Sequence, residues 1–376
     1  MKKILFVISA IALLTACTKS EVAYTDGVEI GIKPLAQNIT KAMVSGTAFP
    51  NESFAVWAYY KQLGKGTSIA AWQSSTLDQQ TYINEKPFSQ RETTGLWGGG
   101  DAAYYWPKVG SLMFVGYYPV SIDAPTEANP EGKVTYEFSS SVNKMTVSRY
   151  SPTTDNYAAT GFVNTAEGAN HVEDFMYFNM TSASCDATTT GPANSVTKGN
   201  HIDVVFKHAL SWLTVVLKRD SSTPAGATIT VKSVYFSEVN TTGTGTVNNS
   251  PAEGESNVIS WDTTDAEISV YVLGNSTTAN AVALTDDYTC KQPVIIPQEM
   301  DGNIVITYEI KSTDGSAFTE TKSIPLADLH EDENDDVDKW NPAKKYTYTI
   351  TIGTSEILID PAITGWDSIE ATIDVK

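Results

Sequence analysis

The sequence is poor in cysteine, histidine and basic residues, and each shortage excludes a class of protein. Its 3 cysteines, Cys17, Cys185 and Cys290, lie far apart, so no disulfide framework can be read from them. None of the 4 histidines has a metal-binding spacing such as HExxH. The 25 Lys and Arg residues face 44 Asp and Glu residues, for a formal charge of −19. This balance argues against a nucleic acid partner, because phosphates attract basic patches.

Catalytic motifs are also missing. Gly98-Gly99-Gly100 is not followed by the Lys-Ser/Thr of a phosphate-binding loop and is expected to form a turn, and there is no Gly-x-Ser-x-Gly elbow. The acidic run 331–338 could supply oxygen ligands to calcium, but it lacks the EF-hand glycine and final glutamate, which favours a solvated loop. His208 is expected to be structural. We therefore predict no enzyme, metal or cofactor, although paired carboxylates of a glycoside hydrolase stay open as a weaker hypothesis.

One apolar run stands at the start of the chain. It extends over residues 4–14, follows Lys2 and Lys3, and closes on Leu14-Thr15-Ala16-Cys17. Roughly twenty residues are needed to span a bilayer, so this run is too short for a transmembrane anchor. The pattern is typical of a bacterial lipoprotein signal in which Cys17 is the lipidated residue. The sequence therefore predicts export, with acyl chains on Cys17 as the anchor.

The rest of the chain has the pattern of an all-β protein with two domains. Polar turns separate segments of alternating apolar and polar residues, as antiparallel sheets require. These expected strands are 53–60, 112–118, 227–236, 267–272, 303–310, 346–352 and 368–375. Residues 188–200 and 240–257 lack periodicity and are expected to be loops. We divide the chain into a signal (1–17), a tether with a removable first strand (18–41), an N-terminal domain (42–198) and a C-terminal domain (199–376).

Aromatic residues gather in the first of these domains and allow two interpretations. Exposed rings could stack on sugars, whereas strand alternation turns about half of them toward a core and favours packing. The residues concerned are Trp57, Tyr59, Tyr60, Trp72, Trp97, Tyr104, Tyr105, Trp106, Tyr117 and Tyr118.

The segment before the first domain has the pattern of a strand that fits a groove. Val28, Ile30 and Ile32 share one face of residues 27–34, and Lys41-Ala42 downstream offers a site for a trypsin-like protease. Removing residues 17–41 would open a hydrophobic slot and detach the protein from its lipid. A strand from another subunit could fill the slot, with a gross gain of about 10 kcal/mol from buried aliphatics and ladder hydrogen bonds. The alternative is a plain tether with an ordinary exposed lysine.

The order of short motifs resembles the fimbrillin-like (minor-fimbrium-like) lipoprotein family of Bacteroidales cell surfaces. Each motif is weak alone, but together they cover nearly the whole chain in the order of the family. They are the lipobox at Cys17, Thr40-Lys41-Ala42, Phe54-Ala-Val-Trp-Ala58, Tyr105-Trp-Pro107 leading to 112–119, Asp174-Phe-Met-Tyr177, Phe206-Lys-His-Ala-Leu210, Ile295-Ile-Pro-Gln298, Trp340-Asn-Pro-Ala-Lys-Lys-Tyr346 and Ile363-Thr-Gly-Trp366.

This resemblance implies a pilin with two β-sandwich domains of Greek-key-like, transthyretin-like architecture. It implies a lipid-anchored precursor at the outer membrane, cleavage at Lys41-Ala42 by a surface protease, and strand exchange with other subunits into an adhesive homo- or heteropolymer. The best-characterised cleavages of the family are at arginine, so the lysine here leaves the protease unidentified. Val28, Ile30 and Ile32 would belong to the discarded strand. The donated strand would be the last one.

The candidate inward residues of that last strand are Ile369, Ala371, Ile373 and Val375. If this strand instead belongs to the second domain's own sheet, the protein would be a tip or anchor subunit. The runner-up hypothesis is a glycan-binding surface lipoprotein that uses the aromatics of the first domain and never polymerises.

Overall fold

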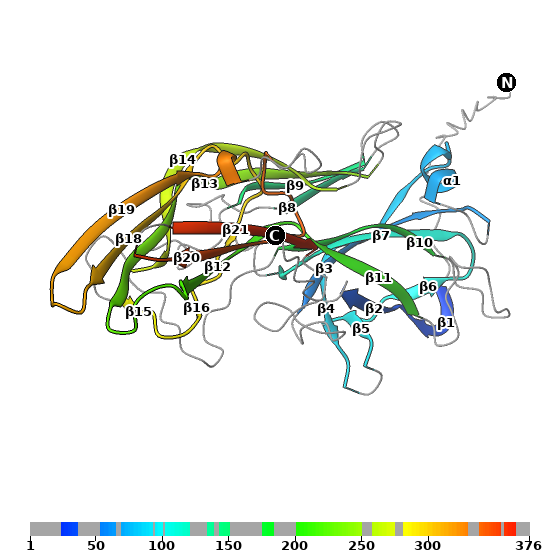
Figure 1. The fold of residues 1–376 in the computed structure, drawn as a ribbon. Coiled ribbons are helices and arrows are strands. Elements are labelled where there is room, and N and C mark those ends of the chain that lie inside the picture. The colour runs from blue at the N-terminus through cyan, green and yellow to red at the C-terminus, as the bar shows by residue number, and fades with distance from the viewer. Residues whose placement is uncertain are drawn as a thin grey trace, which may run out of the picture.

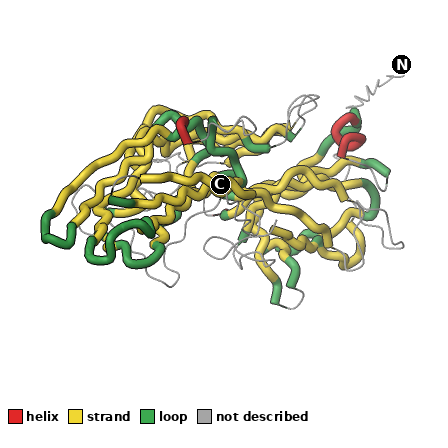
Figure 2. Tube along the Cα trace, viewed as in Figure 1, coloured by secondary structure: helices red, strands yellow, loops and turns green. Residues whose placement is uncertain are grey.

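The computed structural model shows an all-β protein, as the alternating segments predict. Between its strands lie the short helix α1 (Ile69–Ser74) and the 3₁₀ helix η3 (Ala327–Leu329) (Figure 2). No helix in the part of the chain that the structure describes has the length and apolar character needed to cross a membrane. The described residues are 24–36, 53–64, 69–92, 95–100, 102–120, 134–138, 143–150, 175–183, 201–249, 258–274, 281–329, 338–354 and 357–365.

The molecule has two lobes, and the first contains a closed barrel (Figure 1). The barrel strands follow the order β10-β11-β2-β5-β4-β3-β7, and β7 pairs with β10 to complete the circuit. Their bounds are β2 (Gly31–Ala36), β3 (Phe54–Lys61), β4 (Gln80–Gln90), β5 (Trp97–Gly99), β7 (Ser111–Tyr118), β10 (Met176–Ala183) and β11 (His201–His208). A separate pair beside the barrel consists of β1 (Tyr24–Glu29) and β6 (Tyr105–Pro107).

The second lobe is built from two sheets around one core. The first sheet comprises β12 (Ser211–Arg219), β16 (Tyr288–Thr289), β17 (Val294–Ile295), β20 (Lys344–Ile352) and β21 (Ile357–Gly365). The second comprises β8 (Val134–Phe138), β9 (Asn143–Tyr150), β13 (Thr228–Asn248), β14 (Ser260–Leu273), β15 (Val282–Ala283), β18 (Asn303–Lys311) and β19 (Ala317–Pro325). Residues of both sheets, such as Leu213, Val234 and Tyr348, form a single buried cluster between them. This is the face-to-face packing of a β-sandwich.

Strands β3 and β7 are buried along their whole length because both of their faces are covered. In β3, Phe54 and Val56 point into the barrel, whereas Trp57 and Tyr59 belong to a second apolar cluster on the outer face. This second cluster, which we call the central cluster, also contains Trp212 and other residues of the second lobe. Side chains on the two faces of one strand thus pack into two different cores, as the two-residue period of a strand allows.

The hairpin β8–β9 links the two lobes. It precedes β10 in the chain, yet β9 pairs with β13 of the second lobe. Its Tyr136 packs on first-lobe rings, with centroid distances of 5.9 Å to Trp57 and 5.7 Å to Tyr59. The Nε1–H of Trp261 donates to the carbonyl of Ala209 at 2.8 Å within the same region. The lobes therefore share a packed core at their junction.

The chain changes sheets between β11 and β12. Strand β11 pairs with β2 and β10 in the barrel, whereas β12 pairs with β20 in the second lobe. Ala209 and Leu210 form the break, and both are fully buried, so the alternating apolar residues of 202–206 and of 213–217 do not follow one strand register. The proposed domain boundary at 198/199 lies outside the described residues, and the strand that follows it belongs to the first lobe.

One expected loop is wrong. Residues 240–257 are expected to form a loop, but β13 continues to Asn248 and pairs there with both β14 and β9. Gly243 and Gly245 occupy inward positions in this stretch, and a Cβ on Gly245 would lie 2.7 Å from Cγ1 of Val147. Larger neighbours fill the space above the glycines, so the strand is buried at these two positions without a side chain of its own. An alternation of Thr and Gly hides that pattern.

Candidate functional site

The N-terminal segment forms two strands of the first lobe and changes neighbours halfway. Its first part, β1, pairs with β6, in a register that includes Glu29 opposite Tyr105. Its second part, β2, enters the barrel. Ile30 lies between the two and donates its N–H to the carbonyl of Tyr104 at 2.7 Å. The sequence predicts one continuous strand over 27–34, and the structure divides it here because each half follows a different partner.

The inward side chains of the segment fill the barrel interior. Ile30 is 1% exposed and Ile32 is 0% exposed, and both belong to the cluster that contains Phe54, Phe206 and Trp106. Lys33, which alternates with them, is exposed. Val28 lies in β1, but its side chain is outside the described part of the structure. Burial of two isoleucines contributes about 1.5–3 kcal/mol for each side chain.

Strand β2 completes the hydrogen-bonded circuit of the barrel. It runs parallel to β11 over six residue pairs, from His201–Gly31 to Phe206–Ala36. On its other side it pairs antiparallel with β5 through Ile32 and Trp97. Without β2 the remaining barrel strands would form an open sheet with edges at β11 and β5. An open edge presents unpaired N–H and C=O groups and is a template for another strand.

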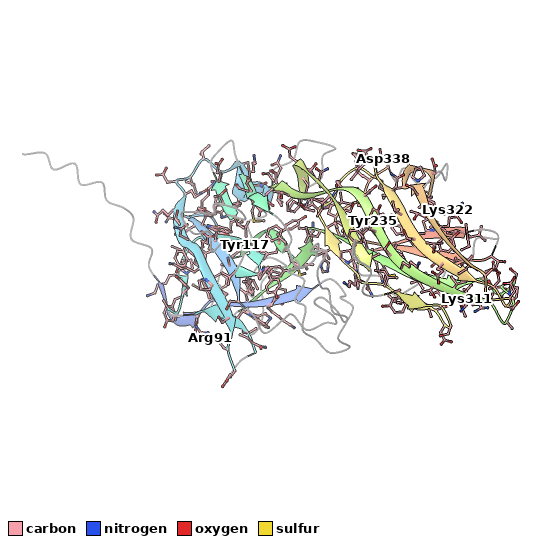
Figure 3. The ribbon with its side chains drawn as sticks, turned by 90° about the vertical axis from the view of Figure 1, so that its left-hand side faces the viewer. Arg91, Tyr117, Tyr235, Lys311, Lys322 and Asp338 are labelled. Atoms are coloured by element: carbon pink, nitrogen blue, oxygen red, sulfur yellow. The ribbon has the colours of Figure 1, made fainter. Side chains whose placement is uncertain are left out.

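An ion pair holds the segment just before it enters the barrel. Nη1 of Arg91 donates to Oε2 of Glu29 at 2.8 Å, and Nη2 of the same guanidinium pairs with Oε1. Figure 3 labels Arg91 on the first lobe, far from Tyr235 and Asp338 on the second. The two residues are 62 positions apart in the chain, and no motif connects them, so the sequence alone does not predict this contact. Such a pair could be found only from the three-dimensional arrangement that brings Glu29, at the end of β1, close to Arg91, which follows β4.

Most of the aromatic residues that suggested a sugar-binding surface are buried. Trp57, Tyr59, Tyr60, Trp72, Trp97, Trp106, Tyr117 and Tyr118 are all 8% exposed or less. Tyr105 is 38% exposed, and Tyr104 is partly buried against Phe88 with a ring-centroid distance of 6.1 Å. These rings therefore serve the barrel and the central cluster. The core-packing interpretation accounts for eight of the ten.

Other candidate positions are structural or lie outside the described residues. His208 is 1% exposed at the end of β11. Cys290 is buried in the core of the second lobe, and this burial raises the pKa of its thiol. The glycines Gly98 and Gly99 lie in β5 rather than in the expected turn. Within the described ranges no cluster of three or more His, Cys, Asp or Glu residues could hold a metal. Of the acidic run 331–338, the structure describes Asp338 alone.

The predicted processing and assembly residues are not among those described. They are Cys17, Lys41, Ala42, Ile369, Ala371, Ile373 and Val375. The structure therefore shows the place that β2 fills between β11 and β5, which we call the groove, and it does not place the cleavage site or the proposed donor strand.

Comparison with known proteins finds similarities at the N-terminus and along most of the chain. A model of prokaryotic membrane lipoprotein lipid attachment sites matches residues 1–18. A search among curated proteins found no match. Similar solved structures include a fimbrial protein from Bacteroides vulgatus, with 17% identity, a TM-score of 0.48, and coverage of 89% of this chain and 99% of that one. Another is the fimbrial anchor protein Mfa2 from Porphyromonas gingivalis, with 11% identity, a TM-score of 0.33, and coverage of 90% and 98%.

A family model gives the assignment. The model described as fimbrillin-like matches residues 58–366, which is most of the chain and includes both lobes. Together with the lipid attachment site, this match places the protein at the cell surface with a membrane anchor and makes other fimbrial subunits its partners. The chain belongs to the fimbrillin-like family, as a fimbrial-type subunit.

Proposed function

We propose that this protein is a pilus subunit that polymerises by strand replacement after its N-terminal segment is removed. The observation that carries the proposal is the position of β2, which fills the last place in the barrel and buries Ile30 and Ile32 inside it. A strand of another subunit entering the same place would recover the ladder to β11 and the two buried side chains. Strand addition of this kind joins proteins through main-chain hydrogen bonds, with pockets for alternate side chains.

The precursor in this proposal is anchored in the outer membrane through acylated Cys17. A trypsin-like surface protease cleaves after Lys41, so Ala42 becomes the first residue and the segment with Val28, Ile30 and Ile32 is lost. The incoming strand is the C-terminal segment with Ile369, Ala371, Ile373 and Val375, donated within a homo- or heteropolymer that supports adhesion. The protein acts as a structural component and not as an enzyme.

The first experiment is the intact mass of the protein recovered from the cell surface, compared with that of a Lys41→Gln variant. We expect the wild-type chain to begin at Ala42 and to form a ladder of oligomers, and the variant to keep its lipid and remain monomeric. Lys33→Gln is the matched control. Lys33 is exposed on β2 but precedes Pro34, before which trypsin-like enzymes cut poorly, so its loss should leave processing unchanged.

A different result would favour the non-polymerising lipoprotein. If the wild-type protein begins at lipidated Cys17, with no shorter form and no oligomers, strand removal does not occur and the proposal is wrong.

A further inference from the structure

Arg91 is oriented toward the N-terminal segment by its own surroundings. Its N–H donates to the carbonyl of Leu96 at 2.9 Å, which fixes the backbone where β4 ends. Its Nη2 donates to the carbonyl of Gly99 at 3.2 Å. The side chain crosses directly over Gly98, where a Cβ would lie 2.3 Å from Nε. Two side-chain contacts within its own hairpin, at Gly98 and Gly99, thus orient the guanidinium in addition to its ion pair with Glu29.

The carboxylate that meets this guanidinium is partly enclosed. The side chains of Arg91 and Glu29 are 35% and 29% exposed, and Oε1 of Glu29 has almost no solvent contact. A guanidinium N–H that donates to a carboxylate oxygen, as Nη1 of Arg91 does to Oε2 of Glu29, selects geometry as well as charge. Because Glu29 directly precedes Ile30, the pair also fixes which residues of the segment enter the barrel.

We propose that Arg91 selects the strand that replaces the N-terminal segment, by requiring a carboxylate immediately before the first inward side chain. This inference rests on the proposed function, because it assumes that the segment is replaced. The required pattern is read from Glu29-Ile30-Gly31-Ile32, with an acidic residue, an inward apolar residue, a residue at the buried Gly31 position and a second inward apolar residue. A strand without the carboxylate would leave the guanidinium without its charged partner.

The C-terminal segment of a second copy of this chain carries this pattern. Glu370-Ala371-Thr372-Ile373 places its acidic and apolar residues at the same spacing as Glu29-Ile30-Gly31-Ile32. In this register, and with the strand direction of β2, Ala371 and Ile373 enter the barrel and Asp374 takes the exposed place of Lys33. Thr372 takes the place of Gly31, where a Cβ lies 2.9 Å from Cδ1 of Leu96, the end of a flexible side chain.

Other acidic residues of the segment give unfavourable registers. With Asp367 at Arg91, Ser368 and Glu370 would face the apolar barrel interior, and burial of an unpaired charge is costly. With Asp374 at Arg91, Lys376 would take the buried place of Gly31. The Glu370 register avoids both, so it is the one that we assign to the donated strand.

Strand replacement in a nicked full-length protein tests the inference. A site for a sequence-specific protease is inserted between Lys41 and Ala42, and the folded chain is cut there, so that β1–β2 stays bound without a covalent link. Labelled peptides of residues 366–376 then compete for the groove. The peptide series contains the wild type, Glu370→Gln, Glu370→Lys and the matched control Asp374→Asn, which removes one negative charge at the exposed position.

We expect Glu370→Gln to weaken binding by about tenfold, a modest factor because the pair is partly exposed, and Glu370→Lys to weaken it further. Asp374→Asn should bind like the wild type. The difference should shrink at high salt, where partly exposed charges are screened. Glu370→Lys binding should recover in an Arg91→Glu protein, and the peptide series remains decisive if that variant does not fold.

Two failures are distinguishable. If the peptides enter the groove but Glu370→Gln and Asp374→Asn bind alike, Arg91 does not select the strand, although strand replacement stands. If no peptide displaces β1–β2, strand replacement itself is wrong, and this inference is wrong with it.

Discussion

Ile32 of β2 lies opposite Trp97 of β5, and this pair joins the two strands that close the barrel. On its other side Ile32 lies beside Ile202 of β11 in the parallel ladder. One residue of the N-terminal segment therefore bridges the two barrel edges that would be free without it. Its side chain is 0% exposed, so the bridge is also a core contact.

The first prediction concerns this bridge. Ile32→Ala should lower the free energy of unfolding of the first lobe by about 2–5 kcal/mol, because it removes a buried side chain and leaves a cavity. Lys33→Ala, on the exposed face of the same strand, is the control and should change it by less than about 0.5 kcal/mol. Urea unfolding followed by tryptophan fluorescence measures both. Equal effects of the two variants would mean that β2 contributes little to the barrel core.

The sequence predicts some strands of each lobe but not how the strands associate. Six of the seven expected strands correspond to β3, β7, β13, β14, β18 and β20, and the seventh lies outside the described residues. Alternation identifies such strands because it reflects which face is buried. It does not identify the partner of a strand, and β9 pairs with β13 across a long stretch of chain.

The candidate site shows the same limit. The buried faces of Ile30 and Ile32 follow from alternation, since both are aliphatic and separated by one residue. Arg91 could not be predicted because its role depends on a close approach over Gly98 and on the register of β1. Local patterns describe which residues are buried, whereas a polar contact between distant segments needs the three-dimensional arrangement.

The second prediction concerns a hydrogen bond between the lobes. The buried N–H of Ile259 donates to the hydroxyl oxygen of Tyr177 at 2.9 Å. Tyr177→Phe should lower the free energy of unfolding by about 1–3 kcal/mol, because it leaves that N–H without its acceptor. Tyr271→Phe, on a partly exposed ring, should have a smaller effect. Equal losses in both variants, measured by chemical denaturation, would show that this hydrogen bond is not important.

The third prediction is a loss of stability at alkaline pH. Burial raises the pKa of Tyr59 to about 12, and burial, opposed by the Ile259 N–H, raises that of Tyr177 to about 12, from an ordinary value of 10.0. A raised folded pKa means that the folded state holds the proton more tightly. The stabilisation is therefore complete below pH 10.0 and is lost as the pH rises toward about 12.

Tyrosinate absorbance and near-ultraviolet circular dichroism, recorded over the same titration, check this prediction. The late part of the absorbance rise should coincide with loss of the tertiary signal, because these tyrosines ionise when the central cluster opens. Tyr59→Phe should remove part of that late rise. If all tyrosines instead titrate near 10 while the tertiary signal persists, the central cluster does not protect them.

The fourth prediction concerns the lipid anchor. Cys17→Ser should give a protein without acyl chains that moves from the detergent phase to the aqueous phase in phase partitioning, because each buried methylene contributes about 0.8 kcal/mol to membrane binding. The matched control is Cys290→Ala. Cys290 lies 3% exposed in the second core, so its loss should leave the lipid in place. Intact mass distinguishes the two variants directly, and a Cys17→Ser protein that keeps its acyl mass would place the lipid on another residue.

Because strand removal is proposed to act downstream at Lys41, wild-type protein released to the aqueous phase should begin at Ala42. Released Cys17→Ser protein that has escaped processing should instead retain the segment with Ile30 and Ile32. The two modes of release therefore separate loss of the anchor from loss of the first strand.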